Sequence, residues 1–191
     1  MQRGTHWLSM RGMLAFAGGA AAALVASRLL PPVMAQAAGT ARAAAGQDPF
    51  DALAHDHRVI LSLLDQMEHS PDSAVFDRTQ RLLRLKHRLA AHAMAEEDVV
   101  YPLLHDRAHE VDDTKQLYSE HAEMKMHLYT LEQMPKNDPR WRGVVRDLRQ
   151  LIEKHVHQEE QVDFPKLRRI MDKEETIRIS GEVQREKALL L

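Results

Sequence analysis

One thirteen-residue pattern occurs twice in the chain, and it constrains the fold more than any other feature. Residues 92–104 and 155–167 align without a gap on the pattern H-x3-E-E-x-V-x-[YF]-P-x-L. A further histidine precedes each copy at nearly the same distance: His57 lies 35 residues before His92, and His121 lies 34 residues before His155. Self-similarity at a fixed spacing is the signature of a repeated structural unit, so the sequence predicts a domain built from two similar halves.

Four segments carry apolar residues at three- and four-residue steps, which is the periodicity of an amphipathic α-helix. Asp48-Pro49 predicts the start of the first helix, because an acid caps free N–H groups and proline suits the first turn. Asp138-Pro139 repeats this signature before the fourth segment. Because short connections join the segments, the sequence predicts an all-α, up-down-up-down four-helix bundle with internal two-fold pseudo-symmetry. Each apolar stripe includes one histidine: His57, His92, His121 or His155.

The first 37 residues have the features of an export signal. They contain arginines but no acidic residue, an apolar stretch from Met13 to Ser27, and the small-residue cleavage site Ala35-Gln36-Ala37. The stretch is shorter than the roughly twenty residues of a membrane-spanning helix, so we expect no stable span after leader removal. The sequence Ser9-Met10-Arg11-Gly12 before it is similar to twin-arginine leaders, although Met10 stands at an arginine position, so the export route stays open.

The predicted organisation therefore has four parts. Residues 1–37 are the signal peptide of an exported, periplasmic protein, and residues 38–47, which are small and polar, are a flexible linker. Residues 48–171 form the bundle. Residues 172–191 form a C-terminal tail or a short fifth helix.

Composition excludes several classes of function. The chain has no cysteine, which excludes disulfide frameworks, thiolate metal sites and cysteine nucleophiles. A formal net charge of −2 gives no electrostatic reason to expect nucleic acid as a partner. Twelve histidines in 191 residues are the surplus that needs an explanation.

The repeated pattern places a histidine and a glutamate on the same face of a helix. Positions four apart lie one turn away from each other, so His92 with Glu96, and His155 with Glu159, each direct a nitrogen and a carboxylate to a common point. An ionised glutamate inside a bundle costs several kcal/mol unless a cation or hydrogen-bond donor compensates it. The two readings are a metal centre and a bundle with buried, hydrogen-bonded His–Glu pairs, and the repetition on four helices favours metal.

The donor set also indicates which metal. Four imidazoles and two carboxylates without a thiolate suit iron, manganese or zinc rather than calcium or magnesium. Six ligands are too many for one tetrahedral zinc, whereas two ions bridged by Glu96 and Glu159 would use all six and leave positions open. Two non-haem irons are therefore favoured over zinc or manganese. Ferritin-like sites use Glu-x-x-His, so the His-x3-Glu order argues against that class.

The chain resembles the hemerythrin-like family of HHE cation-binding domains over roughly Phe50 to Met171. The resemblance lies in His57, His121 and the doubled His-x3-Glu-Glu with Tyr101-Pro102 and Phe164-Pro165. It implies a four-helix bundle with an oxo- or hydroxo-bridged di-iron site, and functions in oxygen binding, redox sensing, iron handling or response to nitric oxide. The implied metal ligands are His57, His92, Glu96, His121, His155 and Glu159.

One departure from the family concerns the third helix. Oxygen-carrying members have a second histidine one turn after the one on this helix, and this chain has Lys125 there. The sequence therefore gives weaker support for reversible oxygen carriage. The lysine either hydrogen-bonds a bound anion or remains solvated. Glu97 and Glu160 are interpreted as acceptors that orient a histidine or as solvent-facing acids, with solvent favoured for Glu160.

The sequence thus predicts an exported di-iron protein that binds or senses oxygen, nitric oxide or peroxide at an open iron position. No acid, base or nucleophile stands out as catalytic, which favours a binding protein over an enzyme. The alternatives are a di-iron enzyme that reduces peroxide or nitric oxide, and a protein for iron handling or storage. A sensor would need a partner protein, because no second signalling domain is predicted.

Overall fold

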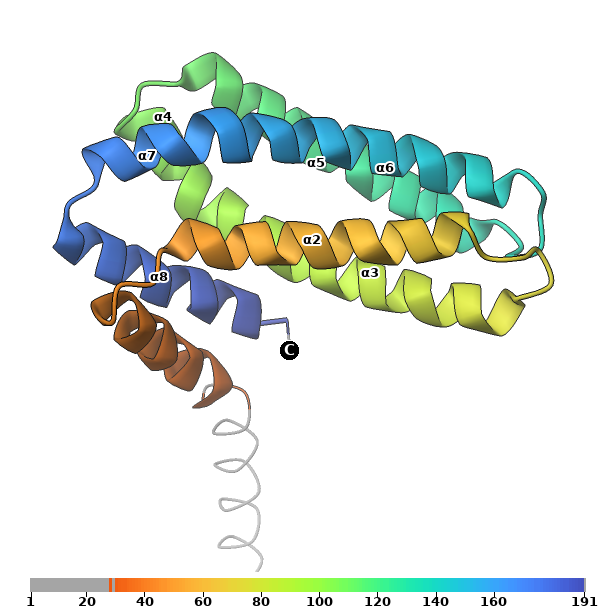
Figure 1. The fold of residues 1–191 in the computed structure, drawn as a ribbon, viewed down its shortest axis with the longest axis horizontal. Coiled ribbons are helices and arrows are strands. Elements are labelled where there is room, and N and C mark those ends of the chain that lie inside the picture. Colours follow the sequence, from red (N-terminus) through yellow and green to blue (C-terminus); the bar gives the residue numbers. More distant parts are fainter. Residues whose placement is uncertain (1–27, 29, 191) are drawn as a thin grey trace, which may run out of the picture.

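A computed structural model describes residue 28 and residues 30–190, and these residues form a helical bundle (Figure 1). A first helix covers residues 30–44. The four long helices that follow are α2 (Pro49–Glu68), α3 (Val75–Ala95), α5 (Val111–Gln133) and α6 (Trp141–Gln158). Shorter helices continue from α3 and α6: α4 (Tyr101–Asp106) and α7 (Phe164–Ile170). The described chain ends with α8 (Lys173–Ala188).

The four long helices contact one another in a ring, which confirms the predicted four-helix bundle. Helix α2 packs against α3 and α6, and α5 packs against the same two helices from the opposite side. Short turns join α2 to α3 and α5 to α6 at one end of the bundle (Figure 1). The C-terminal segment, for which a tail or a short helix was expected, forms α8 and packs against α3.

The predicted helix starts are correct at α2 and displaced at α6. The Asp48 side chain accepts a hydrogen bond from the Phe50 N–H at 2.7 Å, with Pro49 in the first turn, as the sequence predicts. Helix α6 begins at Trp141 rather than directly after Asp138. The Asp138 carboxylate instead accepts from the backbone N–H of Arg140 at 2.9 Å, so it closes a separate turn before the helix.

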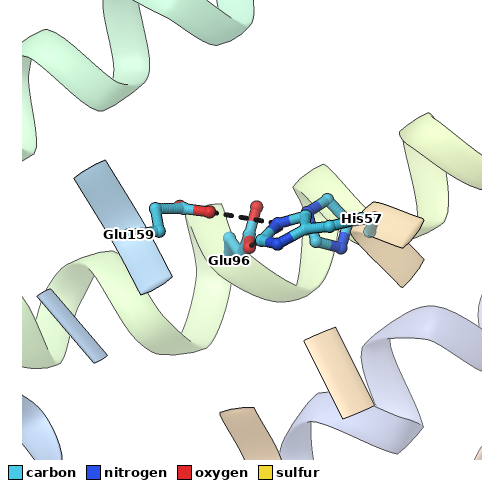
Figure 2. A group of neighbouring side chains, drawn as sticks. His57, Glu96 and Glu159 are labelled. Carbon is cyan, nitrogen blue, oxygen red and sulfur yellow. Dashed lines mark hydrogen bonds and ion pairs between the residues drawn. The ribbon is translucent and has the colours of Figure 1, made fainter. Parts of the chain in front are cut away.

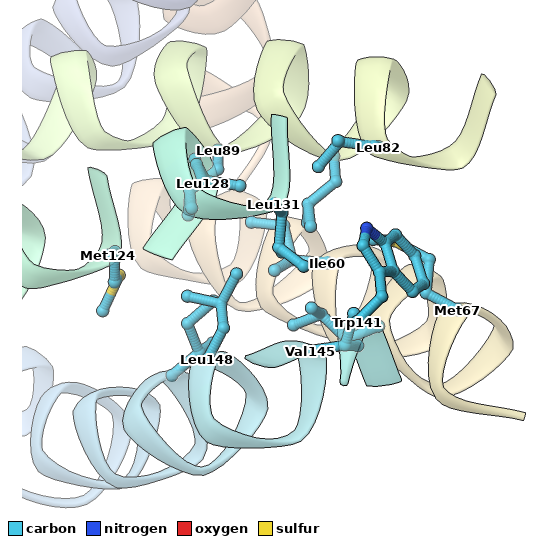
Figure 3. Packing of buried hydrophobic residues seen from close by; sticks show 13 residues of the cluster. Ile60, Met67, Leu82, Leu89, Met124, Leu128, Leu131, Trp141, Val145 and Leu148 are labelled. Carbon is cyan, nitrogen blue, oxygen red and sulfur yellow. The ribbon is translucent and has the colours of Figure 1, made fainter. Parts of the chain in front are cut away.

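Two apolar clusters fill the bundle, and the repeated histidines lie between them. One cluster surrounds Trp141 near the loops that join α2 to α3 and α5 to α6 (Figure 3). The other contains Phe50, Tyr101 and Phe164 and occupies the opposite end. Along α2, for example, His57 follows Leu53 of the second cluster and precedes Ile60 of the first. The polar donors are therefore confined to one layer of an otherwise apolar core.

Each copy of the repeated pattern contains one turn of π-helix. The turns cover Glu96–Val100 and Glu159–Asp163, and each runs directly into the short helix that begins with Tyr101 or Phe164. The backbone N–H of Tyr101 donates to the Glu96 carbonyl, five residues back, and Phe164 donates to Glu159 in the same way. Single π turns inside α-helices are often found at functional sites. The chain therefore stays helical up to each proline, with one π turn directly before Tyr101 and one before Phe164.

The predicted flexible linker, residues 38–47, is a helix as far as residue 44. Alanine is the best helix former, and this alanine-rich segment also has a packing partner in α8. The two helices approach so closely that a Cβ atom added to Gly39 would lie 2.4 Å from the Ser180 carbonyl oxygen, and one added to Gly181 would lie 2.5 Å from Thr40 Oγ1. Only glycine fits at either position. The prediction of a flexible linker is therefore wrong for residues 38–44, because this segment packs against α8 as a helix.

Most of the predicted signal peptide, including the apolar stretch from Met13 to Ser27, lies outside the described residues. The predicted cleavage residues Ala35, Gln36 and Ala37 are described, and they lie within the helix of residues 30–44. Among the described residues, no helix is both long enough and apolar enough to cross a membrane.

Candidate metal centre

The six predicted metal ligands lie together in the buried layer between the two apolar clusters. Their donor atoms form two overlapping groups in which all atoms lie within 4.8 Å of one another. The first group contains His57, His92, Glu96 and Glu159, and the second contains Glu96, His121 and His155. All six residues are at most 2 % exposed. Glu96 belongs to both groups, as a bridging carboxylate would.

All four imidazoles present Nε2 to the centre of the site. His57 Nε2 lies 3.2 Å from Glu159 Oε2 and 3.8 Å from Glu96 Oε1 (Figure 2). His92 Nε2 lies 3.0 Å from both His57 Nε2 and Glu96 Oε1. In the other group, His121 Nε2 lies 3.5 Å from Glu96 Oε2, and His155 Nε2 lies 3.3 Å from Glu159 Oε1.

Several polar atoms at the centre have no hydrogen-bond partner, which tests whether these residues fit a metal. Both oxygens of Glu96, Glu159 Oε2 and His155 Nε2 are buried and make no hydrogen bond, although all of them lie at ion-pair distance from another group of the site. Buried polar atoms without a partner cost about 1–3 kcal/mol each and are rare in folded proteins. Two carboxylates and four imidazoles whose oxygens and Nε2 atoms converge are the donors expected of a di-metal site. The residues present therefore fit the metal pair that the sequence predicts.

An acidic side chain faces the second nitrogen, Nδ1, of every ligand histidine. Hydrogen bonds to Nδ1 fix the tautomer of a metal-binding imidazole and orient its ring, so that Nε2 is left free for the metal. Three of the pairs are hydrogen bonds: His57 with Glu160 at 2.8 Å, His121 with Glu97 at 2.9 Å and His155 with Glu120 at 3.0 Å. In the fourth pair, Asp56 Oδ2 lies 3.7 Å from His92 Nδ1, which is an ion-pair distance and too long for a hydrogen bond.

These four acids follow the internal repeat. Glu97 and Glu160 are the second glutamates of the two patterns, and each orients a histidine of the opposite half. The favoured interpretation of Glu160 as a solvent-facing acid is therefore wrong, because its carboxylate is only 30 % exposed and contacts His57. Asp56 and Glu120 were not singled out from the sequence. The available signal was their matching position, since each directly precedes the first histidine of its half.

Tyr101 is a further residue of the site whose role the sequence analysis missed. Its side chain is fully buried. Its hydroxyl donates to Glu159 Oε1 at 3.0 Å and lies 3.0 Å from His121 Nε2. Burial and the negative charge of Glu159 raise the pKa of Tyr101 well above its usual value, so the hydroxyl stays protonated in the metal-free protein.

The electrostatics of the metal-free site are those of paired opposite charges. Burial alone would lower the pKa of His57, but its contacts with Glu159 and Glu96 raise it to about 11. Burial likewise lowers the pKa of His155, whereas Glu159 and Glu120 raise it to about 10. Burial would raise the pKa of Glu96, yet the neighbouring histidines hold it well below its usual range. Protons on the imidazoles thus occupy the place that metal cations would take.

Comparison with known proteins agrees with this geometry. The model of the family described as the Hemerythrin HHE cation-binding domain matches residues 48–167, which include all six predicted ligands.

The chain belongs to the hemerythrin HHE cation-binding family.

Two curated relatives and one solved structure are similar to this hemerythrin-like chain. A protein named DNA nickase from Nostoc sp. is 31% identical over 126 residues, and the match covers 66% of this chain but only 35% of the nickase. An uncharacterized hemerythrin-like protein of Schizosaccharomyces pombe is 28% identical over 141 residues, which cover 72% of this chain and 68% of that protein. The crystal structure of a hemerythrin HHE cation-binding domain-containing protein from Mycobacterium kansasii has the same fold, with a TM-score of 0.63 at 19% identity, covering 75% of this chain and 88% of that one.

Lys125 stands where oxygen-carrying hemerythrins have a further histidine, and it contacts the site only indirectly. Its side chain is 61% exposed, and Nζ lies 2.8 Å from Glu97 Oε1. The same oxygen accepts from His121 Nδ1. The lysine therefore remains largely solvated, which was one of the two fates expected for it. Its ammonium pairs with Glu97, the acid that orients His121.

Helix α8 reaches the metal centre through Asp56. This carboxylate is 1 % exposed and lies between His92, Arg88 and the ammonium of Lys187 on α8. Burial would raise the pKa of Asp56, but His92 and Lys187 hold it far below its usual value. Part of the orientation of His92 therefore depends on a helix outside the four-helix core.

Proposed function

We propose that this hemerythrin-like protein binds two non-haem iron ions and takes up oxygen or a related small ligand at an open iron position. The observation that carries the proposal is the convergence of six buried donors in two groups that share Glu96. When bound, iron would supply a reversible change of oxidation state and a coordination position for the ligand.

The chain's own residues favour iron over other metals in this proposal. Carboxylate and imidazole donors suit iron, and the acids that accept from Nδ1 of His57, His121 and His155 make these imidazoles more basic and hold them in place. Burial of all six donors keeps bulk water away from the metal pair. Zinc in a structural site would need four ligands in a closed tetrahedron, which leaves two of these six without a role.

The experiment is elemental analysis of the purified full-length protein together with absorption spectra of the reduced protein before and after exposure to air. We expect two irons per chain and a charge-transfer band that develops with oxygen. Two irons without any response to oxygen or nitric oxide would support iron handling or storage instead. One zinc, or no metal at all, would contradict the proposed function.

Reduction of peroxide or nitric oxide is the second candidate, and Tyr101 is the observation that favours it. Its protonated hydroxyl lies at the centre of the site, where a reduction that consumes protons needs a donor. Turnover distinguishes the two candidates. An enzyme consumes many equivalents of peroxide per site, whereas a binding protein reacts once.

Export to the periplasm remains part of the proposal and rests on the sequence of residues 1–37. N-terminal sequencing of the protein recovered from cells tests it, and a chain that starts at Ala38 is expected. Such cleavage would remove residues 30–37 of the first helix and leave Gly39 and Thr40 in contact with α8. A chain recovered from the cytoplasm with residues 1–37 intact would contradict export.

A further inference from the structure

A groove runs between α2 and α3 and reaches the last turn of α8. Its volume is about 430 Å³, which is within the range of roughly 300–1,000 Å³ that small-molecule sites occupy. Helices α2 and α3 lie side by side there, and α8 packs against α3 (Figure 1). None of the six predicted metal ligands lines the groove. The lining residues are Val59, Leu63, Arg84, His87, Arg88, Ala91 and Lys187.

The two walls of this groove differ in chemistry. The α2 wall consists of Val59 and Leu63, both half-buried, and Leu63 packs against the apolar cluster around Trp141. Ala91 continues the apolar surface on α3. The other lining residues of α3 and α8 are basic, and none of the described acidic residues lines the groove. These walls complement a molecule with an apolar body and a negatively charged group.

Two of the basic side chains, Arg88 and Lys187, are held by the buried carboxylate of Asp56. Arg88 Nη1 lies 3.0 Å from one oxygen of Asp56, and the ammonium of Lys187 contacts the other oxygen. Long basic side chains cover apolar surface with their methylene groups while the charged ends lie elsewhere. Two cations on one carboxylate also leave one positive charge in excess. This end of the groove therefore favours an anion and has no head group left to grip it.

Arg84 is the cation that remains available for a ligand. Its side chain is exposed, and it makes no hydrogen bond or ion pair with another described residue. His87 beside it is engaged, since its Nε2 lies 2.7 Å from the carbonyl oxygen of Leu190. The guanidinium of an arginine offers parallel N–H donors that match the two oxygens of a carboxylate. Arg84 next to the apolar α2 wall is thus suited to a carboxylate that carries an apolar chain.

The length of the groove favours one small molecule over a protein or a membrane surface. On α3 the lining extends from Arg84 to Ala91, which is about 10 Å along a helix axis. Stable protein interfaces bury about 800 Å² on each partner, and a groove of this length offers only part of that. An alkyl chain of medium length, in contrast, fits beside Val59 and Leu63.

We propose that this groove binds a free aliphatic carboxylic acid, with the carboxylate at Arg84 and the alkyl chain along Val59, Leu63 and Ala91. The site goes beyond the proposed function, because no metal ion takes part in it. Its walls are complete in the metal-free protein, so the two proposals are tested separately.

Isothermal titration calorimetry of the full-length, metal-free protein with three matched compounds tests the two kinds of contact. Octanoate carries both the chain and the charge, octan-1-ol lacks the charge, and acetate lacks the chain. We expect octanoate to bind at a single site, and the other two compounds to bind at least about tenfold more weakly, since each loses one kind of contact. No binding of octanoate, or equal binding of octanoate and octan-1-ol, would overturn the proposal.

Substitutions on the two walls locate the site. Arg84→Gln should weaken octanoate binding roughly tenfold and leave octan-1-ol unchanged, because only the acid contacts the guanidinium. Val59→Thr keeps the shape of the α2 wall but makes it polar, and should weaken both compounds about threefold. The matched control is Arg169→Gln, which removes an exposed arginine of α7 and should bind octanoate like the wild type. Wild-type affinity in Arg84→Gln would overturn the proposal. Because Arg84 is exposed, this variant keeps the test open if Val59→Thr fails to fold.

Two further measurements distinguish the groove from other binding sites for an acid. If octanoate binds only to the iron-loaded protein and is lost in Glu96→Ala, the carboxylate binds the metal, which overturns the groove and leaves the proposed function standing. Sedimentation with phosphatidylglycerol vesicles without any binding of octanoate would make a membrane surface the occupant and would also overturn the proposal. Octanoate binding by a protein that takes up no iron would support the groove and contradict the proposed function alone.

Discussion

The two halves of the molecule carry the same donors in different surroundings. Each half supplies a histidine from its first helix and a His-x3-Glu from its second, and each orients a histidine of the other half through Glu97 or Glu160. At the position before the proline, however, the first half has Tyr101 and the second has Phe164. The tyrosine directs a hydroxyl to His121, whereas the phenylalanine covers His57 with a ring. Duplication thus provides the donors, and single substitutions make the surroundings of the two donor groups unlike.

The largest expected effect comes from removing the shared carboxylate. Glu96→Ala should abolish binding of both metals, because Glu96 belongs to both donor groups. Glu159→Ala also removes a carboxylate that reaches both sides, since its oxygens lie 3.2 Å from His57 Nε2 and 3.3 Å from His155 Nε2, so we expect metal binding to be weakened but not abolished. Elemental analysis of the two variants measures the difference. Two metals retained in Glu96→Ala would contradict a bridging role.

The orienting acids provide a matched pair of smaller effects. Glu160→Gln should weaken the metal position of His57, and Glu97→Gln that of His121, since the amide no longer accepts as strongly from Nδ1. Loss of such an orienting acid typically costs 10–100-fold in metal affinity. Titration of the metal-free variants with ferrous iron measures each affinity. If both variants bind ferrous iron like the wild type, the contacts of Glu97 and Glu160 with histidines of the opposite half do not contribute to metal affinity.

The metal-free protein should lose stability as the pH rises above about 6.5. The pKa values of His57 and His155 are raised to about 11 and about 10, so the stabilisation from their protonated forms is complete below the unfolded value of 6.5. It is lost as the pH approaches 10 to 11. Thermal unfolding of the metal-free chain between pH 6 and pH 10 should show Tm falling by several degrees.

The iron-loaded protein is the control for this pH dependence. Metal replaces the protons on the imidazoles, so its Tm should change far less over the same range. A metal-free protein whose Tm is flat from pH 6 to pH 10 would show that the buried imidazoles are not held in protonated pairs with Glu96 and Glu159.

The smallest expected effect concerns the hydroxyl that distinguishes the halves. Tyr101→Phe removes a buried hydrogen bond to Glu159 and should cost about 1 kcal/mol in the free energy of unfolding of the metal-free protein. Tyr129→Phe changes an exposed ring and should cost nothing measurable. Urea denaturation of both variants gives the comparison. Equal stability of the two variants would mean that the hydrogen bond from Tyr101 to Glu159 contributes nothing to the free energy of unfolding.

Periodicity and the repeat predicted the bundle and the six donors. Helical spacing places His92 with Glu96 and His155 with Glu159 on one face, and the apolar stripes of the other two helices contain His57 and His121. The sequence did not reveal which acids face Nδ1. Glu160 is adjacent to a ligand, and only the packing of α2 against α6 brings it to His57. The helix of residues 30–44 was missed for a similar reason, since its contact with Gly181 joins segments about 140 residues apart. Contacts between distant segments leave little trace in local patterns.

The most direct test of two unlike metal positions in one buried layer is a crystal structure of the iron-loaded protein with anomalous data collected at the iron edge. Two iron peaks are expected on either side of Glu96, one beside His57 and His92 and one beside His121 and His155. A single peak, or no iron in the layer between the two apolar clusters, would contradict the account.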